Sequence, residues 1–97
     1  MALTPEEKKA KKIASKERQL ARTVSLVERF TAKLDAKQTV RVNLLTELSI
    51  TNDPARRNKL QAKIDKASDM VLRYSEAITR YNFKVNVLTE ELRILKL

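Results

Sequence analysis

Lysine and arginine side chains are the groups in this chain whose number and spacing could support a specific chemistry. The chain has 21 basic and 12 acidic residues, which gives a formal net charge of +9. Such an excess favours contact with nucleic acid, with an anionic membrane surface or with an acidic protein. The net charge alone does not choose among these three partners.

The basic residues gather in two places. The first group, the N-terminal basic cluster, consists of Lys8, Lys9, Lys11, Lys12, Lys16, Arg18 and Arg22. The second group, the tip cluster, consists of Arg56, Arg57, Lys59 and Lys63. Cations near a helix N-terminus oppose the helix macrodipole, so lysines placed there lower the stability of the helix. This cost suggests that the lysines bind a partner. We predict that both clusters contact the backbone of DNA or RNA; the alternative is a solvated, solubilising face.

Catalytic chemistry has little support in this composition. The chain has no His and no Cys, so the usual general base, the thiol nucleophile and the commonest metal ligands are missing. Glu90 and Glu91 are adjacent, but neighbouring residues of a helix point about 100° apart and do not face each other. We therefore predict no enzyme, no catalytic or metal site, no cofactor and no small-molecule substrate.

The elements that must position the charges are two long helices. Thr4-Pro5-Glu6-Glu7 is a capping box with Pro at the first helical position. Nothing breaks the helix until Thr51-Asn52-Asp53-Pro54, where the Asp53 carboxylate can cap a second helix. The sequence predicts one all-α domain over residues 1–97, with helices over about 5–50 and 54–97 and a turn at about 51–53.

A heptad pattern indicates how these helices pack. Apolar or small residues alternate four and three apart through the second helix, as in a coiled coil. They are Leu60, Ile64, Ala67, Val71, Tyr74, Ile78, Tyr81, Val85, Leu88, Leu92 and Leu95. The first helix answers with Ile13, Leu20, Val27, Leu34, Arg41 and Leu48, which pair in reverse with every second member of that list so that residue numbers sum to 108. This mirror symmetry favours an antiparallel coiled-coil hairpin over one helix kinked at Pro54.

The core of the first helix is less regular than that of the second. Between Leu34 and Leu45 the expected core positions hold Gln38 and Arg41, with Thr31 one turn earlier. A polar layer of this kind can set the register of a coiled coil, with Arg41 reaching past the small Ala67. A buried ligand or ion site is the alternative, but no carboxylate lies at the nearby core positions.

Apolar residues outside the core pattern predict a second interface. Phe83, Val87, Ile94 and Leu97 fall on the helix face opposite the core, and Leu26 and Phe30 continue with Val40 and Leu44 along one flank of the first helix. A lone hairpin would leave them exposed, and contiguous exposed apolar surface usually marks an interaction site. We predict that self-association or docking in a larger assembly covers them.

These observations favour a non-enzymatic helical subunit of a larger assembly, which contacts nucleic-acid backbone through its basic clusters. One alternative is a purely structural coiled-coil protein, such as a phage virion, scaffold or filament subunit. Another is a small inhibitor or adaptor that docks on an acidic protein surface. No run approaches the ~20 apolar residues of a membrane span, and no apolar run follows the first lysines as in a signal peptide. We therefore expect no membrane insertion and an intracellular location, in the cytoplasm or within a viral or ribonucleoprotein particle.

Overall fold

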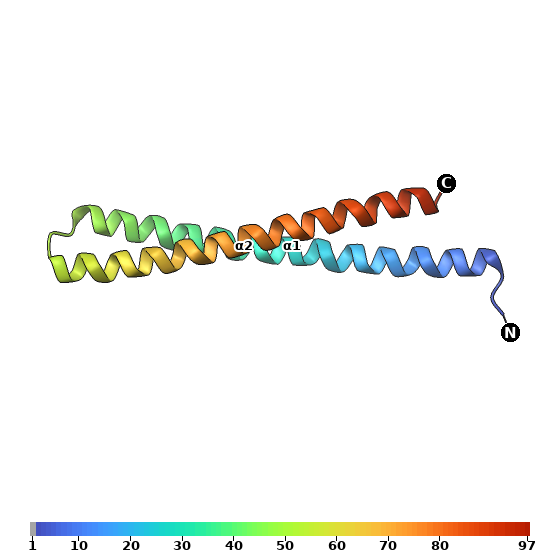
Figure 1. The fold of residues 1–97 in the computed structure, drawn as a ribbon, viewed down its shortest axis with the longest axis horizontal. Helices are drawn as coiled ribbons and strands as arrows, with labels where there is room; N and C mark the ends of the chain where they lie inside the picture. The colour runs from blue at the N-terminus through green and yellow to red at the C-terminus, as the bar shows by residue number, and fades with distance from the viewer. Residues whose placement is uncertain (1) are drawn as a thin grey trace. The chain divides into compact units, whose positions relative to one another are not determined.

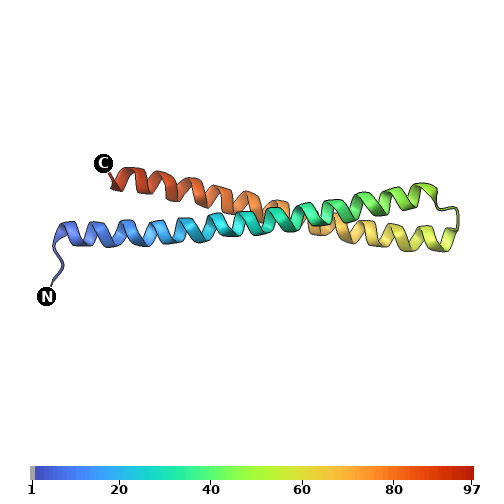
Figure 2. The same ribbon diagram turned by 180° about the vertical axis from the view of Figure 1, so that it is seen from behind.

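A computed structural model describes residues 2–97 of the chain. The described residues form two helices, α1 (Pro5–Ile50) and α2 (Pro54–Leu95), and contain no strand. The helices run in opposite directions about the turn at residues 51–53, as Figures 1 and 2 show. This arrangement confirms the predicted all-α helical hairpin.

Local chemistry at the helix starts explains where they begin. The backbone N–H of Glu7 donates to Thr4 Oγ1 at 3.2 Å, and that of Lys8 donates to the Thr4 carbonyl at 3.0 Å. The first of these bonds satisfies an N–H group that has no partner within the helix, and the second is the first i→i−4 bond of α1. The start of α2 differs in one detail from the sequence-based expectation. The Asp53 carbonyl accepts from the N–H of Arg57 at 2.9 Å, while the Asp53 carboxylate forms no hydrogen bond with a described residue.

Packing divides the described residues into two compact units. The terminal unit combines the segment that ends at Glu28 with Thr79–Leu97, and the turn unit consists of Arg29–Ile78. Each unit contains one segment of α1 beside one segment of α2 (Figures 1 and 2). In the terminal unit Lys16 meets Glu91, and in the turn unit Phe30 meets Tyr74. The residue numbers of the two contacts sum to 107 and 104, which is within four of the predicted sum of 108.

The core positions predicted for α2 agree with the observed burial. Leu60, Ile64 and Ala67 are buried in the turn unit, and Leu88 and Leu92 are buried in the terminal unit. The remaining six positions of the heptad pattern are half-buried. Leu60 is the most enclosed, with 2% of its surface exposed. Burial of this size stabilises a hairpin by roughly 1.5–3 kcal/mol for each large aliphatic side chain.

The core of α1 corrects the sequence-based prediction. Thr31 and Leu45 are exposed, whereas Phe30 and Leu44, one position earlier in each case, are half-buried; Lys37 and the predicted Gln38 are both half-buried. The core positions of α1 are therefore alternately three and four residues apart. A step of three residues follows each of the predicted positions Ile13, Leu20, Val27, Leu34, Arg41 and Leu48. One reason is that the aromatic ring of Phe30 has more apolar surface to bury than Thr31.

Thr23 is a core residue that the sequence pattern did not indicate. It occupies the same row as Phe30, seven residues earlier, and only 3% of its surface is exposed. Its hydroxyl donates to the Gln19 carbonyl at 2.8 Å, four residues back along α1. The local hydrogen bond satisfies the hydroxyl within its own helix, so a polar residue is tolerated at this buried position.

Candidate nucleic-acid interface

Four cations of the N-terminal basic cluster share the outer face of α1. Lys8, Lys11, Arg18 and Arg22 follow one another at intervals of three, seven and four residues, which places them on one side of a helix. Core residues such as Ile13 and Leu20 lie on the opposite side. We call this group the outer stripe; at 1.5 Å per residue it extends over about 21 Å.

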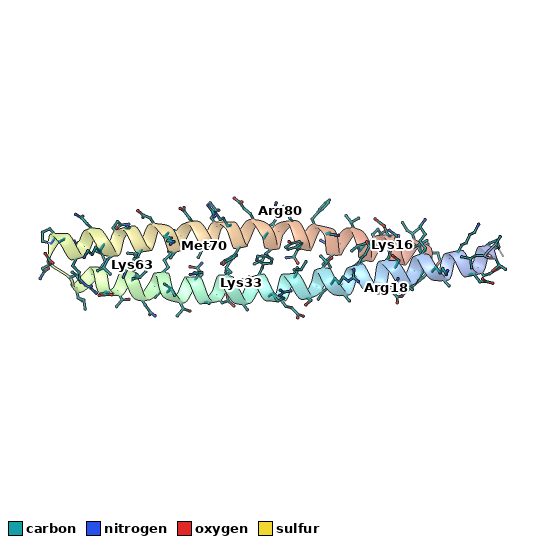
Figure 3. The ribbon with its side chains drawn as sticks, turned by 90° about the horizontal axis from the view of Figure 1, so that it is seen from below. Lys16, Arg18, Lys33, Lys63, Met70 and Arg80 are labelled. Carbon is teal, nitrogen blue, oxygen red and sulfur yellow. The ribbon has the colours of Figure 1, made fainter. Side chains whose placement is uncertain are left out.

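The side chains of the outer stripe have no partners within the described part of the chain. All four residues are exposed, and none uses its side chain in an ion pair or hydrogen bond with a described residue. Figure 3 labels Arg18 on α1. Glu7 lies on the same face four residues before Lys11 but forms no ion pair, so the row keeps its positive charge available to an anionic ligand.

Other members of the N-terminal basic cluster are placed differently. Lys16 forms an ion pair with Glu91 across the terminal unit, and its side chain is only 22% exposed. Lys9 and Lys12 are exposed, and Lys12 lies beside a shallow hollow of about 230 Å³ that Ile94 and Leu95 also line. Lys16 thus joins the two helices, whereas Lys9 and Lys12 remain accessible.

The two arginines of the tip cluster are engaged by the hairpin itself. Arg57 Nη1 donates to the Leu48 carbonyl at 2.9 Å and to the Thr51 carbonyl at 2.7 Å. These carbonyls belong to the end of α1 and to the turn, where helical partners are missing. Arg56 forms an ion pair with Glu47. The positive charges of Arg56 and Arg57 are therefore used within the turn unit, and of this cluster only Lys59 and Lys63 are exposed without a partner among the described residues.

One further ion pair lies on the surface of α2 in the terminal unit. Arg93 Nε donates to the two carboxylate oxygens of Glu90 at 3.1 and 3.0 Å, and its Nη2 donates to Oε1 at 2.5 Å. The Arg93 hydrogen bonds lower the pKa of Glu90 below its ordinary value of 4.5 and raise the pKa of Arg93. Arg93 thus neutralises the carboxylate of Glu90, which lies between the exposed apolar residues described next.

The predicted protein-interface residues of α2 are exposed in the terminal unit. Phe83 and Leu97 expose 71% and 83% of their surface, and Val87 and Ile94 are also exposed. Their spacing of four and seven residues aligns Phe83, Val87 and Ile94 on one face of α2, and Leu97 lies two residues beyond the end of that helix. We call them the apolar stripe; it is available for a partner, although the described residues do not show what covers it.

Two further residues predicted for the same interface, Leu26 and Phe30, belong to α1. Leu26 and Phe30 are half-buried, and the Phe30 ring lies 5.8 Å from the Tyr74 ring at an angle of 50°. The Lys33 ammonium lies 5.2 Å from the centroid of the Phe30 ring, which is a cation–π distance. The ring of Phe30 is therefore used mainly to pack α1 against α2 in the turn unit.

A groove in the turn unit was not expected from the sequence. It measures about 420 Å³ and lies between α1 and α2. Its lining residues are Lys37, Val40, Leu44, Lys63, Lys66, Ala67 and Met70. The sequence held one signal for it, because a small Ala67 at a core position leaves space that a larger residue would fill.

Searches for other kinds of site give negative results. Within residues 2–97, no group of three or more potential metal ligands comes together. Neither α1 nor α2 is sufficiently apolar over its length to span a bilayer. No protein-family model matches the chain, and comparisons with curated proteins and with solved structures find no significant match.

Proposed function

We propose that this protein is a non-enzymatic helical subunit of a larger assembly that contacts nucleic-acid backbone through the outer stripe. The supporting observation is that Lys8, Lys11, Arg18 and Arg22 are exposed on one face of α1 without a partner among the described residues. Phosphate groups are the anions that such a row can track, because each neutralised phosphate releases condensed counterions.

Recognition of this kind reads charge and shape rather than bases. Base stacking needs exposed aromatic rings, but Tyr74 and Tyr81 are half-buried in the hairpin. Phe83 is the most exposed aromatic residue, and it belongs to the apolar stripe on α2. Sequence preference would then come from the shape of the nucleic acid or from other subunits.

The salt dependence of binding tests this proposal. Fluorescence anisotropy with labelled duplex DNA, duplex RNA and single strands should show a log–log slope of about −3 to −4 if four phosphates of a duplex are contacted. The triple variant Lys11→Glu, Arg18→Glu, Arg22→Glu should flatten that slope by roughly 3 units, because three contacts are lost.

A matched control separates the outer stripe from net charge. Arg73→Glu, Arg80→Glu and Lys84→Glu change the same residue types and the same total charge at exposed positions of α2. This control should keep most of the slope. Equal losses in the two triple variants would show that only net charge matters, and undetectable binding of the wild type at ~50 mM salt would refute the proposal.

The apolar stripe favours a second candidate function, that of a structural protein that assembles through copies of itself. Light scattering should then give a mass above that of one chain, and Phe83→Glu with Ile94→Glu should return it to a single chain. Val42→Glu with Leu72→Glu is the matched control, since both residues are exposed apolar positions in the turn unit. A monomeric wild type over the accessible concentration range would eliminate this candidate.

A further inference from the structure

The groove of the turn unit combines an apolar floor with a basic rim. We call its apolar lining residues, Val40, Leu44, Ala67 and Met70, the floor. We call its basic lining residues, Lys37, Lys63 and Lys66, the rim. None of the described residues that line it carries a carboxylate. Figure 3 labels Lys63 and Met70 on α2, one from the rim and one from the floor.

The physical origin of the groove is a mismatch in side-chain size between the two helices. Ala67 is buried with 6% of its surface exposed, but its methyl group is too short to fill the core layer that it occupies. On α1, Val40 remains 43% exposed beside it. Met70 adds an unbranched, adaptable side chain of the kind that lines promiscuous protein-binding surfaces.

The three lysines have no carboxylate partner within residues 2–97. None of them forms an ion pair or hydrogen bond through its side chain with a described residue. Lys37 is half-buried at a core position and lines the groove, and a lysine so placed can bury its aliphatic stem while its ammonium stays in water. Three positive charges from two helices thus surround an aliphatic hollow.

We infer that this groove binds an acidic amphipathic helix of a partner protein. Apolar side chains of that helix enter the groove, and carboxylates one turn away on either side pair with the lysines. A volume of about 420 Å³ is within the range of ligand sites and accepts a few aliphatic side chains. Helix-in-groove recognition uses this combination of apolar anchors and flanking charge.

Charge and shape favour this occupant over the others. A second copy of the chain carries a net charge of +9 and would be repelled by the lysine rim. Nucleic acid would gain little from an aliphatic floor that no aromatic ring lines. A fatty acid has one carboxylate, whereas the rim presents three separate ammonium groups. The inference rests on the proposed role as a subunit of an assembly, and it names the chemistry of one partner.

Calorimetry and NMR with designed peptides test the inference on the full chain. The probe is a synthetic helical peptide with Leu at every third or fourth position and Glu at the flanking positions. Its binding should shift the amide signals of Val40, Leu44, Ala67 and Met70. A peptide of equal charge with Ser in place of Leu should bind at least tenfold more weakly.

Variants of the rim provide the second arm of the test. Lys63→Glu with Lys66→Glu should weaken peptide binding at least tenfold, while Lys59→Glu with Arg73→Glu, a control of equal charge change in the same unit, should weaken it less than threefold. A circular dichroism spectrum equal to that of the wild type verifies that each variant is folded. Equal weakening in the two pairs, or equal binding of the Leu and Ser peptides, would overturn the inference.

Failure of this inference is distinguishable from failure of the proposed function. The Lys11, Arg18, Arg22 triple variant should bind the peptide as the wild type does, within about a factor of three once its altered net charge is screened by ~0.15 M salt. If duplex DNA or a fatty acid shifts the same four amides and displaces the peptide, the groove belongs to that ligand and the inference is wrong.

Discussion

The outer stripe and the tip arginines contain the same kinds of side chain, and the fold uses them in opposite ways. Lys11 and Arg18 extend from the middle of a helix on the face away from α2, where every backbone carbonyl nearby already has a helical partner. Arg57, in the first turn of α2, donates to the Leu48 and Thr51 carbonyls, which lie past the last α-helical hydrogen bonds of α1; the Leu48 carbonyl also accepts from the N–H of Thr51 at 3.3 Å. A guanidinium thus becomes structural where unsatisfied backbone groups lie within its reach.

The difference also explains where we expect ligand contact. Arginines already bonded to the hairpin would have to break those bonds before they could bind phosphate, which reduces their net contribution. The side chains of the outer stripe have no such bonds to break, because they have no partner among the described residues. A dense group of basic residues in the sequence therefore indicates a binding surface only after the cations that are paired within the fold have been left out.

The largest effect that tests this comparison concerns stability. Arg57→Ala should lower the free energy of unfolding by about 1–2 kcal/mol, because two carbonyls lose a charged donor at an exposed site. Arg18→Ala in the outer stripe should change it by less than ~0.5 kcal/mol. Urea denaturation followed by circular dichroism measures both. Similar losses in the two variants would mean that Arg57 is not a structural residue.

Two ion pairs between the helices allow a finer comparison. Lys16 is 22% exposed and pairs with Glu91, whereas Arg56 is 52% exposed and pairs with Glu47. Double-mutant cycles with alanine should give a coupling energy of about 0.5–1 kcal/mol for the first pair and about 0.2–0.5 kcal/mol for the second. The reverse order would contradict the view that the N-terminal basic cluster has one inward-facing, structural member.

The smallest effect concerns the pair of Glu90 and Arg93 within α2. The pKa of Glu90 is lower in the folded chain, so the pair stabilises the fold at neutral pH and loses this contribution as the pH falls through that lowered value, below 4.5. Glu90→Gln should therefore be slightly less stable than the wild type at about pH 7 and equal to it at about pH 2. Thermal melts at the two pH values check this. A difference that persists in acid would indicate another role for Glu90.

Prediction from the sequence succeeded best where a single helix carries the whole signal. The core of α2 could be predicted closely, because eleven apolar or small side chains repeat without interruption; of the buried apolar residues described in α2, Ala77 alone lies outside that pattern. The core of α1 could not, since Thr23, Lys37 and Arg41 interrupt its pattern and two phases fit almost equally well. Contact with α2 selects the phase that places Phe30 against Tyr74.

The candidate sites show the same division. The apolar stripe of Phe83, Val87, Ile94 and Leu97 was predicted on a face away from the core, and these side chains are exposed there. The groove was missed, because its floor comes from Val40 and Leu44 on one helix and from Ala67 and Met70 on the other. A hollow between two surfaces depends on the exact register with which they meet, which no single segment specifies.

The sequence by itself determined the two helices, the turn before Pro54 and the core of α2, because capping, proline geometry and heptad spacing are local properties of one segment. Tertiary structure decided which cations are free, since Arg56, Arg57 and Lys16 find partners only when the opposite helix brings Glu47, the α1 carbonyls and Glu91 within a few ångströms. Ion pairs and hydrogen bonds between the two helices form only at contact distance, so residue spacing along one helix cannot predict them.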